Sequence, residues 1–87
     1  MSVPAIPNEL YLRRLTVADA LYRLDQYLDE AFMVGHHSVR IIHGKGSGAL
    51  RDAVWNHLFE HPLVKSYELA SYGEGGAGVT IVDMEQR

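Results

Sequence analysis

The spacing of apolar and polar positions changes several times along this chain and divides it into segments. Strict alternation over residues 9–13 predicts a half-buried strand with Leu10 and Leu12 toward the core. Between Val17 and Ala31, apolar residues recur at three- and four-residue spacing, which predicts an amphipathic helix. Short runs rich in β-branched residues indicate further strands. The whole pattern predicts the order strand, helix, strand, helix, strand, strand. The predicted strands are residues 9–13, 38–42, 64–69 and 79–82, and the predicted helices are residues 17–34 and 49–60.

Residues that favour chain reversal bound these segments. Thr16 is a suitable N-cap for the first helix, Gly35 is a suitable left-handed C-cap, and Pro62 prevents the second helix from continuing. Two prolines near the N-terminus favour an extended segment. We therefore expect an extended arm or linker stub over residues 1–8, one domain over residues 9–83 and a polar tail over residues 84–87.

The order of the elements predicts an α/β fold, a two-layer sandwich with a four-stranded mixed sheet. The first strand–helix–strand unit should be parallel with a right-handed crossover, and the last two strands can pair antiparallel. Two helices are too few to cover both faces of such a sheet, so both are expected on one face. Tyr11 and Arg13 would then lie on the open face, where an aromatic ring can stack on a base and a guanidinium can contact a phosphate.

Composition narrows the functional classes. The 87 residues include no cysteine, which excludes disulfides, thiol nucleophiles and cysteine-ligated zinc. No apolar run approaches the ~18–20 residues of a membrane span, and no signal peptide is visible, so we expect a cytoplasmic protein without a membrane partner. Eight Lys and Arg against eleven Asp and Glu give a net charge of −3. Any binding to nucleic acid must therefore rest on a local positive patch.

A glycine-rich turn is the strongest candidate for chemistry. It leaves the carboxyl end of a predicted strand and opens a helix, where unpaired backbone N–H groups and the helix dipole favour an anion. It is not a Walker A loop, because Lys45 precedes two of its three glycines. The alternative is a plain tight turn. The predicted phosphate-binding residues are His43, Gly44, Lys45, Gly46, Ser47 and Gly48, with a basic rim extended by Arg14, Arg40 and Arg51.

Two other motifs carry weaker signals. Residues 57–61 spell H-x-x-E-H, an inverted zinc-protease pattern, but Pro62 follows directly and no third ligand is apparent. We interpret them as two exposed histidines near a helix C-terminus, where positive charge is favoured, and predict no metal site. The second glycine-rich segment, residues 73–78, either lets the backbone of a partner approach closely or is a mobile connector.

Three segments resemble the Smr (small MutS-related) domain family: LYLRRLTVADAL (10–21), VRIIHGKGSGALRDAV (39–54) and GGAGVTIV (75–82). The resemblance implies a fold similar to the C-terminal domain of bacterial translation initiation factor three. It also implies a nicking endonuclease acting on DNA or RNA, or a domain that binds nucleic acid, with roles in recombination control and ribosome rescue. The ending is most like the C-terminal domain of the second MutS family, so the chain is expected to be part of a larger MutS-type protein.

The resemblance also suggests roles for single residues. In a nuclease, Arg13 and Lys45 would hold the phosphate and stabilise developing charge, and His43 would act as general acid or base. The family's opening motif carries an acidic residue where this chain has Tyr11, and a glycine where it has Arg14. Tyrosine cannot replace a carboxylate near neutral pH, because its ordinary pKa is about 10.

Three hypotheses follow from these residues. The first is an endonuclease, with Mg²⁺ or Mn²⁺ left open as a cofactor. The second is a non-catalytic module that binds nucleic acid or the ribosome and has lost the carboxylate at Tyr11. The third is a domain that contacts only other proteins, which requires binding to nucleic acid to be absent.

Overall fold

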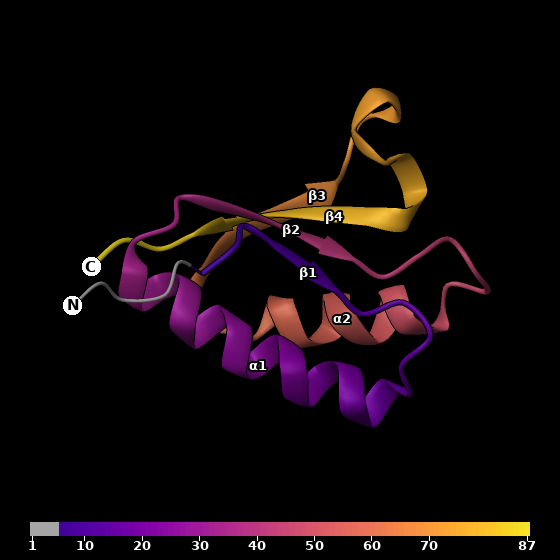
Figure 1. Ribbon diagram of the computed structural model, residues 1–87, viewed down its shortest axis with the longest axis horizontal. Coiled ribbons are helices and arrows are strands. Elements are labelled where there is room, and N and C mark those ends of the chain that lie inside the picture. The colour runs from indigo at the N-terminus through magenta and orange to yellow at the C-terminus, as the bar shows by residue number, and fades with distance from the viewer. Residues whose placement is uncertain (1–5) are drawn as a thin grey trace.

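The structure is a computed structural model that describes residues 6–87, so most of the predicted N-terminal arm lies outside the described part of the chain. The predicted order of strands and helices is confirmed (Figure 1). The elements are β1 (Glu9–Tyr11), α1 (Val17–Val34), β2 (Ser38–Ile42), α2 (Ala49–Phe59), β3 (Val64–Leu69) and β4 (Val79–Met84). Strand β1 is two residues shorter than predicted, and β4 continues two residues further because Met84 is buried in the core.

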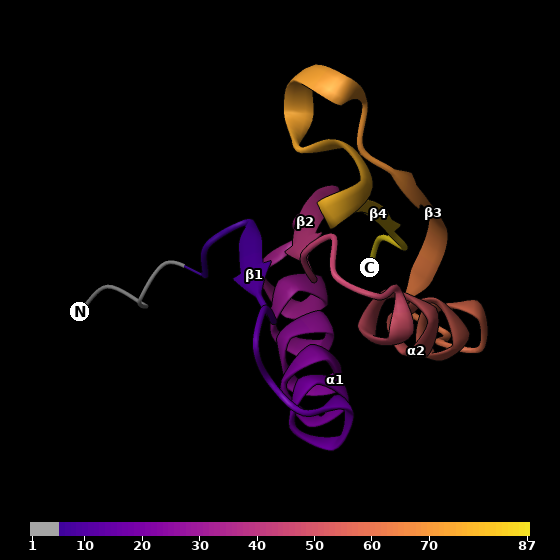
Figure 2. The same cartoon turned by 90° about the vertical axis from the view of Figure 1, so that its right-hand side faces the viewer.

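The four strands form one mixed sheet in the order β1-β2-β4-β3. Strands β1 and β2 pair in parallel, whereas β4 pairs antiparallel with both β2 and β3. Both helices cover the same face of the sheet, and the loop between β3 and β4 stands on the opposite side (Figure 2). The predicted two-layer α/β sandwich with one open face is confirmed.

The core lies between the two helices and the inner face of the sheet. On α1, the buried stripe follows the predicted helical spacing at Leu24, Leu28 and Ala31. Val17 was expected in this stripe but is exposed, because the N-terminal end of α1 points away from the sheet (Figure 1). On the sheet, the fully buried side chains include Leu12, Val39, Ile41 and Val82. In the described part of the chain, neither helix is long and apolar enough to cross a membrane.

Tyr27 and His36 tie the segment before β1 to the rest of the domain. The Tyr27 hydroxyl donates to the carbonyl oxygen of Pro7, and His36 Nε2 lies 2.6 Å from the carbonyl oxygen of Ile6. Burial, with a smaller contribution from the Glu9 carboxylate, raises the pKa of Tyr27 to about 12. The phenol therefore remains a hydrogen-bond donor and holds the entry to β1 in place.

Arg14 lies in the left-handed region, with φ of 69°, where L-residues are strained and glycine is not. The strain occurs in the turn that carries the chain from β1 to α1. This turn directly precedes the N-cap Thr16 of α1.

We expect Arg14→Gly to be more stable to unfolding than Arg14→Ala by about 1 kcal/mol, because both variants lose the guanidinium but only glycine relieves the strain. Urea unfolding of the two variants measures this difference. Equal stabilities, or a more stable alanine variant, would contradict the assignment of strain to this residue.

Candidate phosphate-binding site at the glycine turn

Three connecting segments meet at one end of the molecule, away from the C-terminus (Figure 1). They are the segment between β1 and α1, the glycine turn (residues 43–48) and the β3–β4 loop (residues 70–78). Parallel pairing of β1 with β2 brings their carboxyl ends to the same edge, and antiparallel β4 begins there. The sheet topology therefore places the predicted phosphate turn beside the second glycine-rich segment.

The Gly78 carbonyl oxygen joins these two segments. It accepts a hydrogen bond from the His43 backbone N–H at 3.1 Å and one from the Gly44 N–H at 2.9 Å. A Cβ atom added to Gly78 would lie 3.3 Å from Lys45 Cγ and 3.4 Å from the Lys45 nitrogen, so the two segments are packed almost as closely as a side chain at this position would allow. Gly78 therefore approaches this chain's own turn closely, whereas approach by a partner backbone stays a prediction.

The His43 ring is buried beneath the turn, with only 4% of its surface exposed. Its Nδ1 lies 3.0 Å from the Gly44 carbonyl oxygen, which can only accept, so Nδ1 carries the proton. Its Nε2 then accepts from the Thr80 hydroxyl at 2.8 Å, and this hydroxyl accepts from the Trp55 indole N–H at 2.9 Å. One chain of hydrogen bonds thus links α2, β4 and the start of the turn.

Burial lowers the pKa of His43, and the nearby Arg51 guanidinium acts in the same direction. The hydrogen bond to Gly44 opposes this shift but does not overcome it. The ring is therefore neutral at physiological pH, and both of its nitrogens have protein partners. The role of His43 as general acid or base stays a prediction, whereas its contacts show that it holds the turn against the sheet.

Two hollows flank the turn, and Gly44 and Gly46 line both of them. Four of the predicted basic residues line these hollows, and none of the described lining residues is acidic. No acceptor in the described part of the chain takes the backbone N–H of Lys45, Gly46 or Ser47. The protein is acidic overall, yet this end presents cations and free donors to an anion. The four cations are Arg13 and Lys45 on one side and Arg14 and Arg51 on the other.

Arg40 differs from the other predicted cations. Its Nε donates to the Glu9 carboxylate at 3.1 Å, and its Nη2 donates to the Glu74 carbonyl oxygen at 2.7 Å. It lines neither hollow beside the turn. Its charge is offset by Glu9, and its geometry anchors the β3–β4 loop to the sheet. Tyr11 lies on neighbouring β1 with 61% of its surface exposed, as predicted for the open face, and it too lines neither hollow.

In the folded chain, a carboxylate from another helix lies beside the two histidines of the H-x-x-E-H segment, which the sequence pattern did not reveal. Asp25 on α1 accepts from His57 Nε2 at 3.1 Å and from His61 Nε2 at 3.3 Å. The ligand atoms of the three residues lie within 4.8 Å of one another, as in a metal site. However, the Leu63 N–H donates to His61 Nδ1, which leaves the proton on Nε2. In this structure the three side chains form a hydrogen-bonded cluster that joins α1 to the end of α2. The prediction that both histidines are exposed is wrong, because the His57 side chain is 29% exposed and the His61 side chain 7%.

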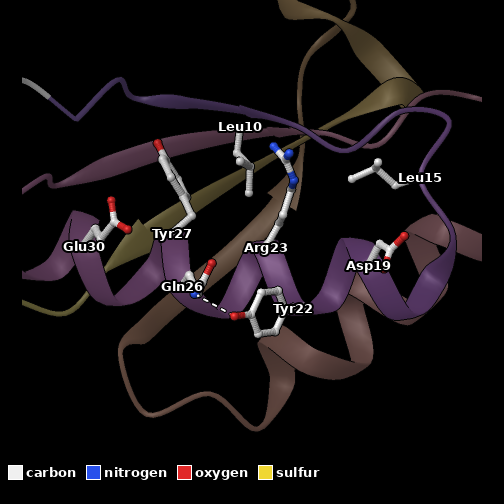
Figure 3. A pocket seen from close by; sticks show the side chains of 8 residues that line it. All are labelled: Leu10, Leu15, Asp19, Tyr22, Arg23, Gln26, Tyr27 and Glu30. Atoms are coloured by element: carbon white, nitrogen blue, oxygen red, sulfur yellow. Dashed lines mark hydrogen bonds between the residues drawn. The ribbon is translucent and has the colours of Figure 1, made fainter.

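A further hollow lies between α1 and β1 and is lined by none of the predicted site residues (Figure 3). Its charged side chains are Asp19, Arg23 and Glu30, and Tyr22 accepts a hydrogen bond from Gln26 within it. The mixed charges favour neither an anion nor a cation. The glycine turn remains the position where the chemistry converges.

Comparison with known proteins identifies the family. The family model described as the Smr domain matches residues 10–85. The chain belongs to the Smr domain family. A relative named Endonuclease MutS2, from Thermomicrobium roseum, is 52% identical to this Smr domain over 84 residues, which are 97% of this chain and 11% of the relative. The domain therefore spans about a tenth of the length of that protein.

Solved structures agree with this assignment. The crystal structure of the Smr domain of Thermus thermophilus MutS2 has a TM-score of 0.87 and 48% identity, covering 88% of this chain and 96% of that one. The crystal structure of YdaL, a stand-alone small MutS-related protein from Escherichia coli, has a TM-score of 0.86 and 28% identity over 91% of this chain and 65% of that one. The predicted family is thus confirmed by sequence and by fold.

We expect the free energy of unfolding of this Smr domain to fall as the pH drops below about 6.5, the ordinary pKa of histidine. Because the pKa of His43 is lower in the folded state, acid protonates the unfolded chain first and favours it. His43→Gln should remove this part of the pH dependence, and His37→Gln, at an exposed position, should leave it. Urea unfolding at about pH 7.5 and about pH 5.5 measures the effect. The same pH dependence in wild type and His43→Gln would contradict it.

Proposed function

We propose that this Smr domain binds the sugar–phosphate backbone of DNA or RNA at the glycine turn, as one part of a larger MutS2-type chain. The observation that carries the proposal is the coincidence of free backbone N–H groups with four cationic side chains, and no acidic one, among the described residues that line the two hollows. Phosphate contacts of this kind depend on charge and donors rather than on base sequence. The expected ligand is therefore a nucleic acid strand without strict sequence preference.

The geometry gives the turn two ways to hold a phosphate. Lys45 and Arg13 approach one side, and Arg14 approaches the other beside the start of α2. Arg51 also reaches this side, where its Nη2 lies 3.2 Å from the Asp52 carboxylate, so part of its charge is offset. Arg13 and Lys45 are thus the strongest candidates for direct contact. A guanidinium can bind two phosphate oxygens at once, and an ammonium acts as a point charge.

The ring of donors around the turn does not fit a divalent cation. Guanidinium, ammonium and backbone N–H groups repel Mg²⁺ or Mn²⁺, which prefer oxygen ligands. Glu9, the carboxylate nearest along β1, accepts from Arg40 instead. The proposed binding therefore uses no metal step.

Partners follow from the same reasoning. The relatives that cover this domain are named Endonuclease MutS2, and this chain matches 11% of the first of them. We propose the larger chain as the covalent context of the domain and nucleic acid as its ligand. Ribosomal RNA also exposes phosphates, so a ribosome is a second candidate partner, and its binding is measured in the same way.

We expect Lys45→Ala to weaken binding to a nucleic acid duplex and to a single strand alike, on the order of tenfold at low salt, because one phosphate contact is lost. The slope of log affinity against log salt should become shallower by about one. Fluorescence anisotropy with labelled oligonucleotides at several salt concentrations measures both. Lys65→Ala, on β3 away from the turn, is the matched control. Equal effects of the two substitutions would contradict a phosphate site at Lys45.

Nicking of the bound strand is a second candidate function. The name of the relatives, Endonuclease MutS2, favours it. The relative from Thermomicrobium roseum is 52% identical to this domain, and the one from Clostridium acetobutylicum is 45% identical. Arg13 and Lys45 line one hollow, and in a nuclease they would stabilise charge on the phosphate as it is attacked. Two features oppose this function in the isolated domain. His43 must give up Thr80 before it can transfer a proton, and Tyr11 offers no carboxylate.

We expect wild type to bind supercoiled plasmid and leave it intact, and Tyr11→Asp to nick it, because the substitution supplies the acidic group that the opening segment lacks. Tyr11→Asn is the matched control, since it has the same shape as aspartate without the charge. Gel electrophoresis after incubation with and without Mg²⁺ or Mn²⁺ measures nicking. Nicking by wild type that Lys45→Ala abolishes would instead establish the domain itself as the nuclease.

A further inference from the structure

Tyr72 is the most exposed aromatic residue among those the structure describes, with its whole side chain in water. It begins a short 3-10 turn, Tyr72–Glu74, in the β3–β4 loop. A phenol ring in this position gains no free energy from burial in the folded domain. Its position therefore has no explanation in the packing of the domain.

Hydrogen bonds within the loop and to β2 support the backbone that carries Tyr72. The Ser71 carbonyl oxygen accepts from the Glu74 N–H at 2.8 Å and from the Gly76 N–H at 3.1 Å. Arg40 on β2 donates to the Glu74 carbonyl oxygen at 2.7 Å. A Cβ atom on Gly75, where φ is 116°, would overlap Val79 Cγ2, so only glycine fits there. These contacts restrict the backbone beneath the ring, and such restriction reduces the entropy lost when a ligand packs on it.

The ring also shares a hollow with the proposed phosphate contact. Lys45 and Tyr72 both line it, and the three other lining residues are Gly75, Gly76 and Ala77. The β3–β4 loop, which supplies four of the five lining residues, stands on the side of the sheet away from the helices (Figure 2). A cation and a flat aromatic surface in one small hollow match the two halves of a nucleotide, its phosphate and its base.

We propose that Tyr72 stacks on an unpaired base of the strand whose phosphate is bound at Lys45, so that the domain prefers nucleic acid with a single-stranded segment. The inference rests on the proposed function and adds the class of substrate to it. Bases in a duplex are stacked on their neighbours and expose only their edges, whereas an unpaired base offers its face. Stacking of one base on an aromatic side chain contributes ~1–3 kcal/mol and is tolerant of sequence.

The test compares a single strand of about 12 nucleotides with the duplex of the same length, both fluorescently labelled, in anisotropy titrations with the whole chain. Tyr72→Ala should weaken binding to the single strand about 5- to 100-fold and change binding to the duplex less than about twofold. Tyr72→Phe keeps the ring and should retain wild-type affinity within about twofold. The control is Tyr22→Ala, which removes an exposed tyrosine from α1 on the other layer of the fold and should have no effect.

Each other outcome overturns the inference, and Lys45→Ala separates it from the proposed function. If Tyr72→Ala binds the single strand like wild type while Lys45→Ala binds it more weakly, the phosphate site is supported and the stacking role of Tyr72 is wrong. Tyr72 would then be a candidate contact for another protein. Equal losses on single strand and duplex, or a phenylalanine variant as weak as alanine, also contradict stacking on an unpaired base. If wild type binds neither oligonucleotide, both proposals fall together.

Discussion

The double hydrogen bond to the Gly78 carbonyl oxygen is the contact on which the rest of the site depends. It fixes the first two residues of the glycine turn, His43 and Gly44, against the start of β4. With their N–H groups occupied, the following N–H groups of the turn are left to face outward. The same contact brings the β3–β4 loop over Lys45, so the phosphate donors and the exposed Tyr72 ring occur together. A Cβ atom at position 78 would lie 3.3 Å from Lys45 Cγ, so a larger residue there would require the Lys45 side chain to shift by a few tenths of an ångström.

The buried, neutral ring of His43 holds the glycine turn against the sheet. The chain of hydrogen bonds from Trp55 through Thr80 ends at His43 Nε2, and Nδ1 donates to the Gly44 carbonyl oxygen. Burial keeps the ring uncharged. The positive potential at the turn is therefore supplied by arginine and lysine side chains at the surface, where charge is less costly. An acidic protein can in this way present a cationic end, because its carboxylates lie elsewhere or, like Glu9, face an arginine of their own.

Local patterns in the sequence predicted most of the fold and the centre of the site. Helical spacing and caps located α1 within its observed bounds, and the strand–turn–helix arrangement located the glycine turn. Contacts between distant segments could not be predicted in this way. The spacing of apolar residues does not show that β4 lies between β2 and β3. The hydrogen bond between His43 and Thr80 joins residues that are 37 positions apart in the sequence. The one between His57 and Asp25 joins residues that are 32 positions apart. Such contacts depend on the packing of whole elements, which no short window contains.

The most direct measurement is nuclear magnetic resonance of the backbone amides during titration with a dinucleotide, compared with a nucleoside that lacks the phosphate. If the glycine turn binds phosphate, the amide signals of Lys45, Gly46 and Ser47 will shift most with the dinucleotide and little with the nucleoside, because these N–H groups point at the anion. Larger shifts at another part of the domain, or equal shifts with both compounds, would contradict the account.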